Sequence, residues 1–138
     1  MKWVYILIGV VVAIPISVFG IMYAASEMGG EVVTLQRAEA DGQVSDVRIW
    51  IVDADGTSWV EHGAPDSHWI TRLENEPMVT LSRAGQSVTY VAAPDREAHE
   101  QYHQLRQEKY GVADNIVAVV TGRTDACPGV PVRLQLTQ

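Results

Sequence analysis

The residues from Trp3 to Ala25 form an apolar segment without a single charged side chain. As a helix this segment is roughly 35 Å long, enough to cross the ~30 Å hydrocarbon core of a bilayer. A cleaved signal peptide is the alternative, but its apolar region is about 7–15 residues long and ends at a small-x-small site. A cut after Ala25 would place bulky Tyr23 at the third position before it. The sequence therefore predicts an uncleaved transmembrane anchor over 1–26 that contacts the lipid bilayer.

The charges beside this segment predict its orientation. Lys2 and the amino terminus precede it, whereas Glu27 and Glu31 follow it and the next basic residue is Arg37. Basic residues are retained on the cytoplasmic side of a membrane segment. We therefore expect a single-pass membrane protein with its amino terminus in the cytoplasm and its domain outside. Residues 27–30 (EMGG) are expected to form a short linker.

The remaining chain, 31–138, is long enough for one domain with a modest core. Without Lys2, the ten basic residues of the chain become nine, against seventeen acidic residues. Such an acidic domain is not expected to bind nucleic acid. Cys127 is the only cysteine, which excludes an internal disulfide and a cysteine-cluster metal site.

Short segments rich in β-branched and aromatic residues, bounded by turn residues, predict six strands. The expected strands are 31–37, 46–53, 57–62, 78–83, 87–92 and 130–136. Asp55-Gly56 is a strong two-residue hairpin signal. Helices are expected over 68–76, ending before Pro77, and over 96–110, ending at Gly111. The pattern predicts a mainly β fold with α additions, a small β-barrel.

The second expected strand is apolar on both faces. Ile49 and Ile51 face one side, and Trp50 and Val52 face the other. A strand buried on both faces needs a cover beyond the core of its own sheet. A bound cofactor, a helix or a partner subunit would supply that cover, and a homodimer through this strand is one prediction.

The order of these segments resembles the deazaflavin-dependent nitroreductase family, relatives of the split β-barrel flavoproteins that include pyridoxamine phosphate oxidase. Residues 46–92 are similar to the central block of that family, which contains a W-x-x-N-L-x-x-N-P-like helix. Here Trp69, Leu73, Asn75 and Pro77 match, and Arg72 replaces the first Asn. Residues 93–111 are similar to its polar helix and 130–136 to its closing strand. The resemblance implies a six-stranded split β-barrel of FMN-binding type over 31–138.

The resemblance also implies a deazaflavin coenzyme or FMN, held in a groove of a protein that is often dimeric. The loop along the coenzyme ring maps to 61–64, and the phosphate-binding turn maps to 37–42, which keeps Arg37 but carries two acids. Acidic residues repel a phosphate. The expected coenzyme-binding residues, from this loop, this turn and their neighbours, are Arg37, Arg48, Trp50, Glu61, His62, Gly63, His68, Trp69 and Arg72.

Residues 99–103, HEQYH, match the H-E-x-x-H pattern of zinc peptidases. A catalytic zinc needs a third protein ligand, and the extended pattern fails because Arg106 replaces its Gly and Lys109 its third His. We therefore predict a solvated helix and no metal site. Cys127 is interpreted as a small buried hydrophobe rather than a haem ligand.

The leading functional prediction is a membrane-anchored oxidoreductase. It would transfer hydride from a reduced deazaflavin or flavin to a nitroaromatic or quinone acceptor, with the coenzyme supplying the chemistry. No residue is predicted to act as an acid or a nucleophile. The alternative is a non-catalytic binding or assembly module that has lost its coenzyme, which the acidic turn 37–42 favours and the loop histidines disfavour.

Overall fold

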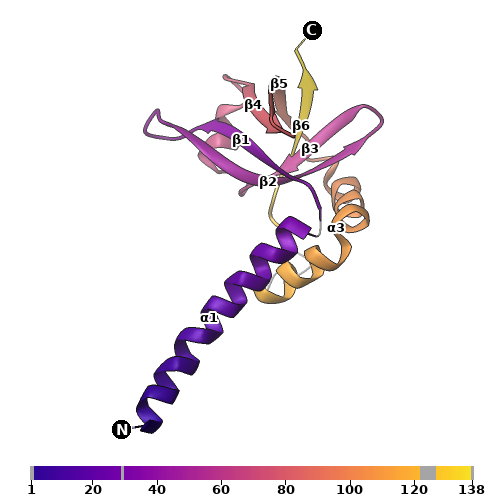
Figure 1. Ribbon diagram of the computed structural model, residues 1–138. Coiled ribbons are helices and arrows are strands. Elements are labelled where there is room, and N and C mark those ends of the chain that lie inside the picture. The colour runs from indigo at the N-terminus through magenta and orange to yellow at the C-terminus, as the bar shows by residue number, and fades with distance from the viewer. Residues whose placement is uncertain (1, 29, 122–126, 138) are drawn as a thin grey trace.

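The structure is a computed structural model that describes residues 2–28, 30–121 and 127–137. A long helix precedes the strands, and two helices interrupt them (Figure 1). The elements in chain order are α1 (Lys2–Met28), β1 (Val32–Ala38), β2 (Val44–Ala54), β3 (Thr57–Glu61), α2 (His68–Arg72), β4 (Met78–Arg83), β5 (Gln86–Pro94), α3 (His99–Thr121) and β6 (Pro131–Leu136).

The six strands form a closed barrel in the order β1-β2-β3-β6-β5-β4, and every pairing between neighbours is antiparallel. All six expected strands and the mainly β fold with α additions are confirmed. The core forms because alternate side chains point into the barrel. Its most buried members include Val33, Leu35, Ile51, Val60, Leu81, Val132 and Leu134.

Two hairpins have two-residue turns with positive φ at both positions. Asp55 and Gly56 have φ values of 51° and 75°, and Ala84 and Gly85 have values of 49° and 78°. This is the turn whose twist matches that of paired strands. The Asp-Gly signal is confirmed. The second turn is strained at Ala84, because a left-handed conformation costs a residue with a Cβ roughly 1–2 kcal/mol.

A second core lies outside the barrel, between β2, β3 and α3. The ring of Trp50 stacks on Tyr110 with the ring centroids 4.5 Å apart, and Val52, Trp59 and Tyr102 are buried beside them. The doubly apolar strand is thus covered by a helix of its own chain. The apolar outer face of β2 is therefore no longer an argument for a homodimer through this strand. Dimerisation through another surface stays a prediction.

Both later helices differ from their expected lengths. α2 ends at Arg72 rather than at 76, and a turn follows in which Asn75 and Glu76 donate to the carbonyl of Arg72. α3 changes direction at Gly111 (φ 32°, ψ −98°), where the helix was expected to end, and then continues to Thr121. The second half of α3 was not predicted.

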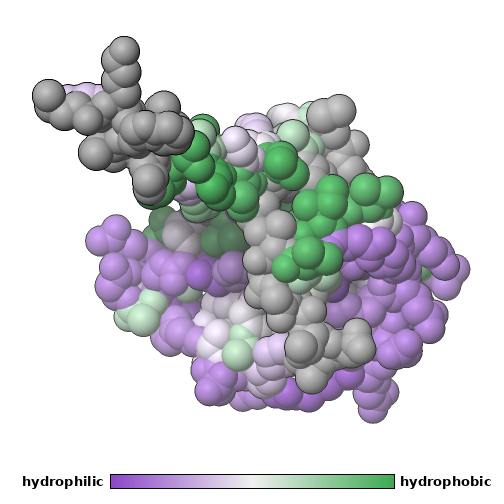
Figure 2. Space-filling view, turned by 90° about the horizontal axis from the view of Figure 1, so that it is seen from below, coloured by the Kyte–Doolittle hydropathy of each residue, from purple (hydrophilic) through white to green (hydrophobic). Residues whose placement is uncertain are grey.

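α1 is one helix that runs past the expected anchor, 1–26, into the predicted linker, of which Gly29 lies outside the described residues. Its carboxyl end lies beside α3 (Figure 1), and the guanidinium of Arg48 lies 5.8 Å from the ring centre of Tyr23. This end of the apolar segment therefore packs against α3 and contacts Arg48 of β2. Seen from below, hydrophobic residues gather over α1 and the adjacent part of α3 (Figure 2).

Among the residues that the structure describes, no helix has the length and apolar character needed to span a bilayer, so the expected transmembrane anchor is not supported. The predicted localisation and orientation are not tested by the structure.

Candidate functional site

The loop after β3 is held in place by Trp69 of α2. The indole of Trp69 is buried in the main core, and its Nε1 donates a hydrogen bond to the carbonyl of His62. Gly63 has a φ of 94°, and a Cβ added there would lie 3.1 Å from the Oγ of Ser67. Only glycine adopts such a conformation without strain. The loop that the family resemblance assigns to the coenzyme ring is therefore fixed by one hydrogen bond and one tight turn.

Two arginines lie beside this indole. The guanidinium of Arg37, at the end of β1, lies 5.9 Å from the ring centre of Trp69. Arg72, at the end of α2, lines the same small hollow of about 40 Å³ as Arg37 and Trp69. Two cations from distant parts of the chain therefore line one hollow at the end of the barrel, together with the carboxylate of Glu76.

Each of these cations already has an acidic partner. The Nε of Arg37 donates to Glu39 over 2.9 Å, and the Oγ of Ser45 donates to the same carboxylate. The Nε of Arg72 donates to Glu76 over 3.0 Å. Both pairs are partly exposed to solvent, and exposed ion pairs of this kind stabilise a protein by about 0–1 kcal/mol.

The two loop histidines differ in environment. His62 is half-buried, and burial together with the nearby Arg37 lowers the pKa of its imidazole below the usual value, although Glu39 opposes the shift. The ring is therefore neutral at pH 7. His68 is exposed at the first turn of α2. It lies near Glu39, whose carboxyl pKa is lowered chiefly by hydrogen bonds from Ser45 and Arg37.

Six of the nine residues expected at a coenzyme site thus lie at one end of the barrel: Arg37, His62, Gly63, His68, Trp69 and Arg72. Three lie elsewhere. Arg48 faces α1, Trp50 stacks on α3, and the side chain of Glu61 turns towards Arg106 of α3. The sequence did not predict this placement, because α3, which contacts Trp50 and Glu61, is distant from them along the chain.

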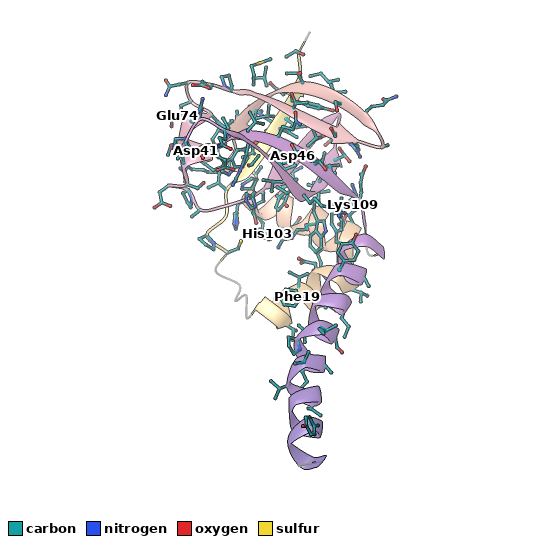
Figure 3. The ribbon with its side chains drawn as sticks, turned by 60° about the vertical axis from the view of Figure 1, so that its left-hand side comes forward. Phe19, Asp41, Asp46, Glu74, His103 and Lys109 are labelled. Carbon is teal, nitrogen blue, oxygen red and sulfur yellow. The ribbon has the colours of Figure 1, made fainter. Side chains whose placement is uncertain are left out.

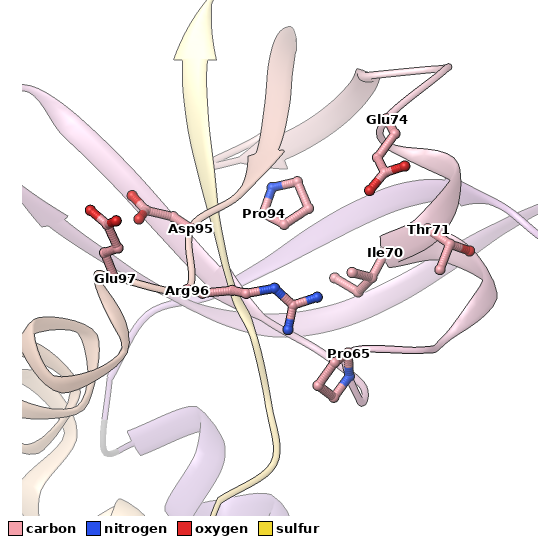
Figure 4. A pocket seen from close by; sticks show the side chains of 8 residues that line it. All are labelled: Pro65, Ile70, Thr71, Glu74, Pro94, Asp95, Arg96 and Glu97. Atoms are coloured by element: carbon pink, nitrogen blue, oxygen red, sulfur yellow. The ribbon is translucent and has the colours of Figure 1, made fainter.

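A larger hollow of about 510 Å³ lies on the other side of α2 (Figure 4). Its charged lining consists of one cation, Arg96, and three carboxylates, Glu74, Asp95 and Glu97. Such a lining repels phosphate. The sequence offered no sign of this hollow because its residues come from two separate segments, 65–74 and 94–97.

No family model matches this chain, and no curated protein matches it. Solved structures do match, with low identity. An F420-H2-dependent reductase matches with a TM-score of 0.53 and 17% identity over 76% of this chain and 94% of its own. The haem storage protein HutZ from Vibrio cholerae gives 0.52 and 16%, over 82% and 86%. A pyridoxamine 5′-phosphate oxidase-type protein from Listeria innocua gives 0.52 and 10%, over 84% and 90%. These similarities confirm the split-barrel fold.

Proposed function

We propose that this chain is a split-barrel oxidoreductase that binds a flavin or deazaflavin coenzyme at the end of the barrel formed by β1, α2 and the loop after β3. The observation that supports this most strongly is the convergence of Arg37 and Arg72 on one hollow beside Trp69. The acceptor that we propose is a quinone or a nitroaromatic compound. The similarity to a reductase and to an oxidase-type protein is consistent with this class of reaction.

The residues present fit the anionic part of such a coenzyme. Guanidinium groups bind phosphate through two parallel hydrogen bonds. Glu39 and Glu76 now accept these bonds, but the pairs are partly exposed and weak, so a phosphate can replace the carboxylates. Arg37 and Arg72 would therefore hold the phosphate.

The loop 62–64 fits the ring system, because Gly63 has no side chain to keep a planar ring from the backbone. Trp69 is too deeply buried to stack on the ring, so its role is to position the loop through the carbonyl of His62. The coenzyme, when bound, supplies the hydride. His62, neutral at pH 7, has one N–H that can donate a hydrogen bond to an acceptor oxygen.

The test is a calorimetric titration of the full chain with FMN and, separately, with reduced deazaflavin. We expect micromolar binding of one of them, and the variants Arg37→Gln and Arg72→Gln should each weaken it on the order of tenfold, as for the loss of one charge-assisted hydrogen bond. Arg96→Gln is the matched control, because Arg96 lines the acidic hollow instead. If neither coenzyme binds at micromolar concentration, the oxidoreductase proposal is wrong.

A non-catalytic binding or assembly module is the second candidate. Glu39 favours it, because its carboxylate accepts hydrogen bonds from both Arg37 and Ser45 and so neutralises the cation needed for phosphate. A protein of this kind would bind neither coenzyme, whatever residue stands at position 39.

A further inference from the structure

The HEQYH motif forms half of a cluster that its sequence context did not reveal. His99 and His103 lie one turn apart on α3, with their Nε2 atoms 3.2 Å from each other. Glu61 at the end of β3 and Cys127 just before β6 complete the group, and one ligand atom from each of the four residues lies within 4.8 Å of the others. Figure 3 shows His103 at the lower side of the barrel, the side from which α1 extends, whereas Asp41 and Glu74 lie at its upper left.

We propose that Glu61, His99, His103 and Cys127 bind one zinc ion in a closed, structural site that fastens α3 and the start of β6 to the barrel. Two imidazoles, one thiolate and one carboxylate are ligands that zinc accepts, and four protein ligands without an open position are typical of structural zinc. The sequence showed no sign of this cluster because Glu61 and Cys127 lie outside the HEQYH motif.

The distances between ligand atoms match a tetrahedral site. With zinc–ligand distances near 2.0–2.3 Å, neighbouring ligand atoms of a tetrahedron lie about 3.4 Å apart. The Nε2 atoms of His99 and His103 are 3.2 Å apart, and Nε2 of His103 is 3.5 Å from Oε2 of Glu61. The Sγ of Cys127 is 3.4 Å from Oε1 of Glu61. The two histidine nitrogens and Oε2 of Glu61 thus form two edges of a tetrahedron near the required length, and the thiol lies beside the other oxygen of the same carboxylate.

The charges beside the cluster favour a cation. The side chains of Glu61, Arg106 and Asp114 are 8%, 6% and 8% exposed. Arg106 contacts Glu61 over 3.3 Å and Asp114 over 3.2 Å, so two buried carboxylates share one guanidinium. Moreover, Oε2 of Glu61, which points to His103, accepts no hydrogen bond from the described residues. A buried oxygen without a hydrogen bond is costly, and a metal ion at this oxygen would remove that cost.

The backbone beside Cys127 is shaped for close approach to Glu61. Glu61 pairs with Pro131 in the ladder between β3 and β6, which brings the segment before β6 alongside it. A Cβ on Gly129 would lie 2.6 Å from the Cδ of Glu61, so no other residue fits there without displacing the carboxylate. Gly129 thus allows the thiol to reach the cluster.

Metal binding changes the hydrogen bonds of one histidine. Arg106 now donates to Nδ1 of His103 over 3.0 Å, which places the imidazole proton on Nε2. In a metal-bound state that proton would lie on Nδ1, so Arg106, which can only donate, would give up its hydrogen bond to His103 and keep its contacts to Glu61 and Asp114. The thiol of Cys127 gives its proton to solvent, so one proton leaves for each zinc bound.

The test is metal analysis of the purified full chain, followed by chelation and titration with zinc or with cobalt as a spectroscopic probe. We expect one zinc per chain, and the absorption of tetrahedral cobalt with a thiolate ligand. Bound zinc should raise Tm by about 10 °C at a free concentration one hundred times Kd.

The variant His99→Gln/His103→Gln and, separately, Cys127→Ser should weaken zinc binding on the order of 100-fold and remove the thermal shift. The matched control is His62→Gln/His68→Gln, which removes the two histidines outside the cluster and should bind zinc like the wild type. Far-ultraviolet circular dichroism of each variant without metal checks that it folds.

Two outcomes would overturn the zinc site. One is the absence of stoichiometric binding at micromolar zinc in the wild type. The other is equal binding by the wild type and the folded His99→Gln/His103→Gln variant. The coenzyme titration reports on different side chains, Arg37 and Arg72, so either proposal can fail without the other.

Discussion

Removing one hydroxyl, by Tyr110→Phe, should measurably loosen α3 from the barrel. Tyr110 is buried, and its hydroxyl accepts a hydrogen bond from the backbone N–H of Ile51 over 3.0 Å. The same hydroxyl lies 2.6 Å from the carbonyl of Glu31 and 2.8 Å from that of Ile51, and it donates to one of them. The hydroxyl of Tyr110 therefore takes the place of a strand partner at Ile51, because the pairing of β2 with β1 ends at Trp50.

The expected cost follows from what the variant leaves behind. Phenylalanine keeps the ring that stacks on Trp50, and the carbonyl of Ile51 still accepts from Lys109 over 2.8 Å. The N–H of Ile51 is left buried without this partner, which costs about 1–3 kcal/mol. For a chain of this size we expect a loss near 2 kcal/mol, or a fall in Tm of about 8 °C.

Urea unfolding followed by tryptophan fluorescence measures this difference directly. Tyr90→Phe is the matched control, because Tyr90 also packs against a core but lies on β5 rather than on a helix, and it should change the free energy of unfolding by less than about 0.5 kcal/mol. Equal stability of the two variants would refute the role assigned to the Tyr110 hydroxyl.

Three further predictions concern pH and backbone strain. Burial raises the pKa of Asp53, but hydrogen bonds from Arg83 and Ser58 outweigh it and lower that pKa to about 2. The ionised Asp53 therefore stabilises the fold fully above about pH 4, and this stabilisation is lost as the pH falls towards 2. After allowance for solvent exposure, Arg83→Gln should remove about 1 kcal/mol of this stabilisation, measured by acid unfolding. The pKa of His62 is lowered in the folded state, so the protein loses stability as the pH falls below about 6.5. The Tm of His62→Gln should therefore change less between pH 7 and 5 than the Tm of the wild type. Identical dependence of Tm on pH in the two proteins would contradict this. Gly63→Ala should cost about 1–2 kcal/mol in urea unfolding because of its positive φ, whereas Gly42→Asn, in an open turn, should cost less.

The strands and hairpins were predictable because their signals are local. Alternation in 130–136 and the Asp55-Gly56 turn each need only a few adjacent residues, and both appear in the structure as expected. The second half of α3 was not predictable in this way, because Gly111 resembles a helix end and the continuation after the change of direction depends on packing beside α1.

In the candidate sites, too, features that depend on nearby residues were predictable and features that depend on distant residues were not. The loop 61–64 and Trp69 were identified through the family resemblance, and the structure adds that Arg37 and Arg72 share one hollow with this indole. The direction of Glu61 could not be read from sequence, because it depends on Arg106 and on the segment before β6, far away along the chain. Local spacing shows only the two histidines of HEQYH, whereas Glu61 and Cys127 join the cluster from the end of β3 and from the segment before β6.

The coenzyme proposal is tested most directly by one calorimetric comparison of the wild type with Glu39→Gln, titrated with FMN and with reduced deazaflavin. Glu39 competes with phosphate for Arg37, so its neutralisation should tighten binding of the favoured coenzyme roughly three- to tenfold. The account predicts micromolar binding by the wild type and tighter binding by Glu39→Gln. Absence of binding by both proteins would contradict it and leave the non-catalytic module as the function of this barrel.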